Sequence, residues 1–139
     1  MKSIVTSFFL ALLATSCLAG EKEKAFEESF RSAVSMNDQA MFELVQFANN
    51  TPKLFRDMIM ESLREDRKKT IKAISFSDPA KDAVFEFEYG GTTYTTSLPV
   101  VKEMKIKYDM TKDASGVEGT TYRLGLHDGV YKIVVPQAK

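Results

Sequence analysis

The residues best suited to nucleophilic catalysis or to metal binding are scarce in this chain. It has one cysteine, Cys17, and one histidine, His127. Zinc sites usually draw their ligands from these two residue types, so the sequence predicts no metal ion and no other cofactor. His127 directly precedes Asp128-Gly129, a pair typical of tight turns. We therefore interpret His127 as an exposed turn residue rather than a base or a ligand.

Two further patterns have structural explanations that the sequence favours. Met58 and Met60 could bind a soft metal ion through their thioether groups. Residues two apart on a helix point in different directions, however, which favours positions in the core or along a pocket. Gly90-Gly91 lies between two strand-like segments and lacks the following helix that a phosphate-binding loop needs. The sequence contains no catalytic triad and no nucleophile elbow.

The charge balance argues against nucleic acid as a partner. The whole chain has 19 basic and 19 acidic residues, whereas nucleic-acid binding needs a basic surplus on one face. The densest basic stretch mixes both signs: Glu61, Arg64, Glu65, Asp66, Arg67, Lys68 and Lys69. We interpret this stretch as the solvated face of a helix, in which Glu65 stands four residues before Lys69 for a stabilising pair.

Hydrophobic spacing predicts three helices in the first half of the chain. The first covers about residues 21–36, and the second extends to about residue 48 after a cap at Asn37-Asp38. Thr51 as N-cap and Pro52 at the first helical position start the third helix. The residues expected to face the core are Phe26, Phe30, Ala33 and Val34, then Met41, Leu44, Val45 and Ala48, then Phe55, Met58, Ile59 and Leu63.

The second half of the chain predicts strands. They are expected over residues 70–77, 83–89, 92–98, 100–110, 120–126 and 130–135. Gly90-Gly91 and Asp128-Gly129 are expected to form two-residue hairpin turns, which need positive φ. Pro99 is expected to interrupt the ladder or to mark a sheet edge, Pro136 to end the last strand, and residues 111–119 to form a loop.

Helices that precede strands, without alternation, predict one α+β domain over residues 20–139. The sequence resembles the NTF2-like (cystatin-like, SnoaL-like) superfamily in Phe26-x3-Phe30-x3-Val34-x2-Asn37-Asp38-x3-Phe42-x-Leu44 and in the closing HDGVYKIVV, residues 127–135. The resemblance implies N-terminal helices packed on a curved antiparallel sheet of four to six strands, the NTF2-like cone. The family has a short strand between its second and third helices, where this sequence predicts none, and Tyr131 stands where a Trp would be expected.

The resemblance also implies candidate chemistry, because some relatives use an acid, a tyrosine and a histidine inside the cone for isomerase or dehydratase reactions. The candidates in this chain are Glu86, Glu88, Tyr94 and Tyr122. A glutamate buried beside tyrosines could act as a general base if desolvation raised its pKa. Aromatic residues alternate with the two glutamates, however, and this pattern favours a solvent-facing position for both.

These observations favour a binding module over an enzyme. We expect a non-catalytic protein of the cell envelope that binds a small molecule or another envelope protein, and the alternative is a cone-pocket isomerase or dehydratase. The resemblance also implies that the protein forms a homodimer, since the sheets of relatives often pair back to back.

The first 19 residues have the three parts of a secretory signal peptide: basic Lys2, an apolar run over residues 4–14, and small residues before the charged segment 21–24. The apolar run is shorter than the roughly 20 residues of a membrane span, so an uncleaved anchor is the weaker interpretation. We expect an exported protein, periplasmic or secreted, with lipid anchoring as the alternative.

Cys17 allows two modes of cleavage. Cys17-Leu18-Ala19 is similar to an A-x-A site, and cleavage after it leaves Gly20 first. Residues 13–17, LATSC, instead resemble a bacterial lipobox, in which Cys17 becomes the first residue and carries a diacylglycerol. The lipobox pattern has Leu three residues before the cysteine, where this chain has Ala14, and plain export is favoured. Neither mode leaves a free thiol in the mature domain.

Replacement of Cys17 separates these modes. If the chain is lipidated, Cys17→Ala should move the protein from the membrane to the soluble fraction, because two acyl chains suffice for stable anchoring at about 0.8 kcal/mol per buried CH₂. If the chain is only exported, wild type and variant should both be soluble, with Gly20 first by N-terminal sequencing. A variant that pellets with membranes as the wild type does would contradict both cleavage modes.

Overall fold

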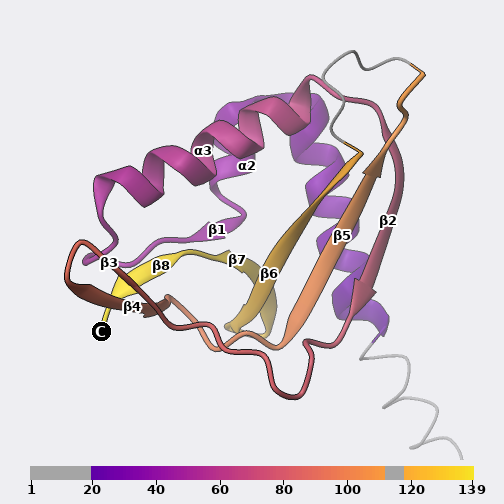
Figure 1. The fold of residues 1–139 in the computed structure, drawn as a ribbon. Helices are drawn as coiled ribbons and strands as arrows, with labels where there is room; N and C mark the ends of the chain where they lie inside the picture. Colours follow the sequence, from indigo (N-terminus) through magenta and orange to yellow (C-terminus); the bar gives the residue numbers. More distant parts are fainter. Residues whose placement is uncertain (1–19, 112–117) are drawn as a thin grey trace, which may run out of the picture.

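The computed structural model describes residues 20–111 and 118–139, which form an α+β fold (Figure 1). Residues 20–36 are helical. The elements that follow are α2 (Asp38–Phe42), β1 (Val45–Gln46), α3 (Lys53–Arg67), β2 (Ile71–Ser77), β3 (Phe87–Tyr89), β4 (Thr92–Thr96), β5 (Lys102–Tyr108), β6 (Gly119–His127), β7 (Val130–Val134) and β8 (Pro136–Ala138). The predicted signal peptide, Cys17 and most of the predicted 111–119 loop lie outside the described residues. None of the helices in the described part is long and apolar enough to cross a membrane.

The strands of the described residues form two sheets. The larger has the order β1-β7-β6-β5-β2 and is antiparallel except for the parallel pair β1 and β7, and the smaller has the order β3-β4-β8. The chain passes between the sheets over residues 78–86, over residues 97–101 and at Val135. Ser97 joins the last two crossings, because its N–H donates to Val135 O (2.8 Å) and its Oγ accepts from Val135 N–H (3.1 Å). Gly125 leaves room for the second crossing, since a Cβ there would lie 2.8 Å from the Pro99 carbonyl oxygen.

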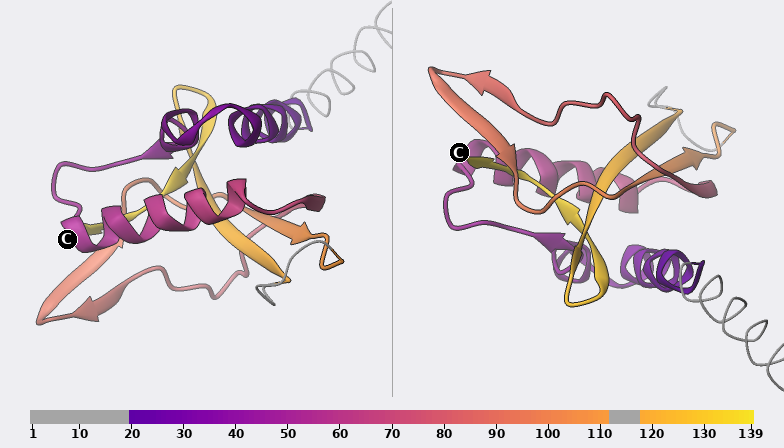
Figure 2. Two further views of the ribbon diagram at one scale, coloured as in Figure 1. Left: turned by 90° about the horizontal axis from the view of Figure 1, so that it is seen from above. Right: turned by 90° about the horizontal axis from the view of Figure 1, so that it is seen from below.

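The helices pack on one face of the larger sheet (Figure 2). Alternation along β5 sets this face, because Met104, Ile106 and Tyr108 are buried while Lys105 and Lys107 are exposed. The core is completed by residues of the helices and of the neighbouring strands: Phe26, Phe30, Ala33, Met41, Leu44, Val45, Leu63, Tyr122, Leu124, Tyr131, Ile133 and Val135. The smaller sheet lies near the N-terminal end of α3 (Figure 1).

The second helix is shorter than the sequence predicts. Its cap is confirmed, since Asn37 Oδ1 accepts the Ala40 N–H at 2.8 Å. The prediction that it extends to residue 48 is wrong, because β1 follows at Val45 and pairs with Ile133 of β7. Leu44 and Val45 are buried, and pairing with β7 supplies the backbone hydrogen bonds that would otherwise be missing at that sheet edge. A short strand therefore lies between the second and third helices, contrary to the expectation.

The start of α3 also differs in detail. Pro52 is the N-cap residue and Lys53 the first helical residue. The prediction of Thr51 as the N-cap is wrong, because its Oγ1 accepts the N–H of Ala48 (3.3 Å) and closes the preceding turn. Met58, expected in the core, is 59% exposed.

Among the strands, β2 and both hairpin turns are confirmed, with positive φ at Gly90, Gly91, Asp128 and Gly129. The strand expected over residues 83–89 is reduced to β3. Its first part lies over β6 instead, where the Arg123 guanidinium stands 4.7 Å from the centre of the Phe85 ring. Pro136 does not end the sheet structure but begins β8, a position where proline is tolerated at the start of an edge strand.

Candidate functional site

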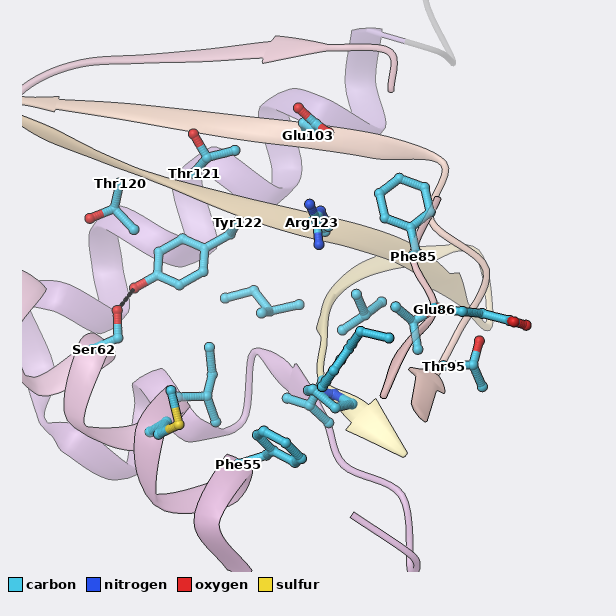
Figure 3. Close-up of a pocket in the computed structure, with 18 of the residues that line it drawn as sticks. Phe55, Ser62, Phe85, Glu86, Thr95, Glu103, Thr120, Thr121, Tyr122 and Arg123 are labelled. Carbon is cyan, nitrogen blue, oxygen red and sulfur yellow. Dashed lines mark hydrogen bonds between the residues drawn. The ribbon is translucent and has the colours of Figure 1, made fainter. Parts of the chain in front are cut away.

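The two predicted glutamates do not meet the predicted tyrosines. Glu86 and Glu88 are both exposed, and Glu86 forms an ion pair with Lys139 at 2.9 Å. The Glu86 side chain points away from the neighbouring cavity (Figure 3). Neither carboxylate is therefore in the desolvated position that a general base with a raised pKa requires.

Tyr94 is buried in an aromatic cluster at the N-terminal end of α3. Its ring stacks on Phe87 with 5.4 Å between centroids, and the edge-to-face contact with Phe55 is 5.1 Å. Phe55 also meets the rings of Phe87 and Tyr89 edge to face. Such pairs contribute about 0.5–1.5 kcal/mol each beyond their buried area, so this cluster holds the smaller sheet against α3.

Tyr122 is the one predicted candidate that contacts a buried acid. Its hydroxyl donates a hydrogen bond to Oδ2 of Asp66, and the Tyr108 hydroxyl donates to Oδ1 of the same carboxylate. Asp66 is 1% exposed. Ser62 Oγ lies 2.9 Å from Tyr122 Oη, and Thr120 Oγ1 lies 2.9 Å from Tyr108 Oη. Two hydroxyls, from β5 and β6, thus contact the carboxylate, and two more, from α3 and β6, contact those hydroxyls.

The charged residues around Asp66 in the sequence predict that it lies on a solvated helix face, and this prediction is wrong. The signal that identifies it is helix spacing. Leu63 follows Ile59 by four residues, and Asp66 follows Leu63 by three, so Asp66 continues the buried stripe of α3. Ser62 stands one turn before it on the same side of the helix.

Burial dominates the electrostatics of this cluster. Desolvation raises the pKa of Asp66 above its ordinary value, while the hydrogen bonds from Tyr108 and Tyr122 and the charge of Lys69 act in the opposite direction. The Lys69 ammonium lies 4.8 Å from the centre of the Tyr108 ring. Burial and the charge of Asp66 raise the pKa of Tyr122, so this hydroxyl keeps its proton.

A cavity of about 610 Å³ adjoins the cluster. Its walls are mainly apolar, with Phe55, Met58, Ile59, Phe87, Ile133 and Val135 among the lining residues. The hydroxyls of Ser62, Thr120 and Tyr122 lie on one side, and Glu86 and Thr95 lie on the other (Figure 3). Asp66 itself does not line the cavity, so a bound molecule would meet the hydroxyls and not the carboxylate.

The remaining candidates lie apart from this cavity or at its rim. His127 is in the β6–β7 turn, with its side chain 47% exposed and 3.4 Å from the Asp128 carboxylate. Met58 lines the cavity, whereas Met60 is half-buried and does not. Within residues 20–111 and 118–139, no group of three or more side chains of the ligating types could hold a metal ion.

Comparisons with protein-family models, with curated proteins and with solved structures find no match to this chain. An apolar cavity with a few hydroxyls at one side is suited to bind a small molecule, and the buried acid behind these hydroxyls fixes their orientation.

The raised pKa of Asp66 predicts an unusual pH dependence. The folded protein keeps the proton of Asp66 above the ordinary pKa of 3.8, where the unfolded chain has lost it. Folding therefore takes up a proton in this window, and the stability contributed by Asp66 falls as the pH rises through it. The free energy of unfolding of the wild type, relative to Asp66→Asn, should decrease as the pH is raised from 3.8.

Urea unfolding of both proteins across this pH range measures the difference. Asp38, whose pKa the Arg67 hydrogen bond holds below its usual value, gives the opposite slope but contributes equally to both proteins. A relative stability that instead rises with pH would show that the pKa of Asp66 is lowered.

Proposed function

We propose that the protein is a non-catalytic binding module that takes up a small, mainly apolar molecule in the cavity beneath α3. The observation that carries this proposal is the combination of mainly apolar walls with a few hydroxyls, of which those of Ser62, Thr120 and Tyr122 lie together on one side. Ligand sites of this kind bury most of a small molecule against apolar side chains and orient it with few polar groups.

The aromatic walls favour a flat ligand. Phe55 and Phe87 both line the cavity, and their rings already meet edge to face at 5.7 Å. A flat ring inserted beside them would gain similar contacts. Among the charged lining residues, Glu86 is paired with Lys139, and Glu103 and Arg123 have opposite charges, so the lining has no surplus of either sign and favours a neutral ligand.

The NTF2-like cone is part of the same proposal. It is supported by helices on one face of a sheet, by a second small sheet beside them, by a cavity between these layers and by the short strand β1. We further propose the cell envelope as the place of action, reached through the signal peptide, with lipidated Cys17 as an alternative anchor and an envelope protein as an alternative partner.

An isomerase or dehydratase is the second candidate, because Asp66 is an internal acid hydrogen-bonded to Tyr122, a residue that lines the cavity. Binding is favoured over catalysis because both oxygens of Asp66 accept hydrogen bonds from tyrosines and neither faces the cavity. A general base has to reach the proton that it removes.

The binding proposal is tested with the neutral fluorophore 2-phenylindole. The wild type should bind it with a change in fluorescence, and Met58→Arg should weaken binding by about tenfold, or about 1.4 kcal/mol, because apolar contact at the cavity wall is replaced by a charged group. Met36→Arg is the matched control, since Met36 is 62% exposed against 59% for Met58 and does not line this cavity.

Binding that Met58→Arg leaves intact, or that Met36→Arg weakens equally, would place the probe elsewhere. If 2-phenylindole does not bind the wild type at all, the proposal of a flat apolar ligand is wrong.

A further inference from the structure

We infer that the ligand of this cavity carries a hydrogen-bond donor, an N–H or O–H group on an apolar body, and that Ser62 Oγ accepts this hydrogen bond. The inference rests on the proposed binding function and adds to it the polar chemistry of the ligand. It follows from counting the protons in the hydroxyl cluster.

The buried carboxylate of Asp66 fixes the protons of its neighbours. At a pH above its raised pKa, Asp66 is ionised and can only accept hydrogen bonds, and its two oxygens accept one from Tyr108 and one from Tyr122. Each tyrosine hydroxyl has a single proton. The proton of Tyr122 is therefore committed to Asp66, and Tyr122 stays protonated because burial and the neighbouring charge both disfavour its phenolate.

The proton of Ser62 is fixed by its contact with Tyr122. Its Oγ lies 2.9 Å from Tyr122 Oη, a distance at which either group could donate. Because Tyr122 has no second proton, Ser62 is the donor and Tyr122 the acceptor. The dashed line in Figure 3 marks this hydrogen bond. Ser62 has then used its only proton, and its oxygen lone pairs remain available.

The lone pairs of Ser62 Oγ are accessible to a ligand in the cavity. Ser62 is half-buried on α3 and lines the cavity, whereas Asp66 does not. Thr120, which belongs to the same hydroxyl cluster, is already engaged with Tyr108 at 2.9 Å, and Thr121, which also lines the cavity, is exposed to solvent. The negative charge of Asp66 polarises the chain of hydrogen bonds through Tyr122 to Ser62. It therefore favours a hydrogen-bond donor of the ligand at Ser62 Oγ and disfavours an acceptor there.

Three matched probes test the inference. 2-Phenylindole has an N–H donor, its N-methyl derivative has none, and 2-phenylbenzofuran replaces the N–H by an oxygen. The wild type at neutral pH should bind 2-phenylindole about fivefold more tightly than 2-phenylbenzofuran, the value of one ordinary hydrogen bond. The N-methyl derivative should bind as weakly as the benzofuran.

Variants assign the preference to Ser62. Ser62→Ala should bind all three probes with equal affinity, and Ser62→Thr should keep the preference because it keeps the hydroxyl. Ser29→Ala, the same change on the exposed side of the first helix, should leave the preference unchanged. Tyr122→Phe removes the acceptor for the Ser62 proton, so Ser62 can then donate, and the affinity for 2-phenylbenzofuran should rise relative to that for 2-phenylindole.

Two results would overturn the inference alone: equal binding of all three probes by the wild type, or a preference that survives Ser62→Ala. Absence of binding for every probe would instead overturn the proposed binding of flat apolar ligands, on which the inference rests. These outcomes are distinct, because the first two require measurable binding and the last excludes it.

Discussion

The buried carboxylate of Asp66 is the constraint on which the rest of the structure depends. A charge removed from water is costly unless hydrogen bonds replace its hydration. Here Tyr108 from β5 and Tyr122 from β6 supply them, so α3 can sit on the sheet only at the height and rotation that bring Asp66 between both hydroxyls. The position of α3 in turn sets the size of the cavity, because Phe55, Met58 and Ile59 form one of its walls.

The two ends of α3 are held by different interactions. Near its C-terminal end Arg67 donates to the Asp38 carboxylate (2.6 Å) and to the carbonyl oxygens of Val34 and Met36, both at 3.2 Å. At the other end Phe55 packs into the aromatic cluster with Tyr94. The cavity lies beside the middle of the helix, between a polar anchor and an apolar one. The lining of the cavity includes groups of both kinds, the hydroxyls of Ser62 and Tyr122 and the rings of Phe55 and Phe87.

The local pattern was enough to predict the α+β class, the first helix, β2 and both hairpin turns, because each depends on neighbouring residues. It failed where distant residues decide. The local sequence predicts a helix at Val45, but pairing with β7 makes this residue part of a strand. It predicts a solvated Asp66, but two tyrosines from later strands contact and bury this carboxylate. The apolar stripe of α3 contained the signal for Asp66. No sequence signal brings Tyr108, which lies 42 residues away in the chain, to the same carboxylate.

Asp66 is a desolvated carboxylate held by two tyrosine hydroxyls. An NMR titration of the side-chain carboxyl carbons, in protein labelled at aspartate and with Asp66→Asn to assign the resonance, measures its pKa. We expect a titration midpoint above the ordinary 3.8 for Asp66, because burial outweighs the hydrogen bonds. A midpoint at or below 3.8 would contradict it, since the carboxylate would then be solvated or paired with a charge.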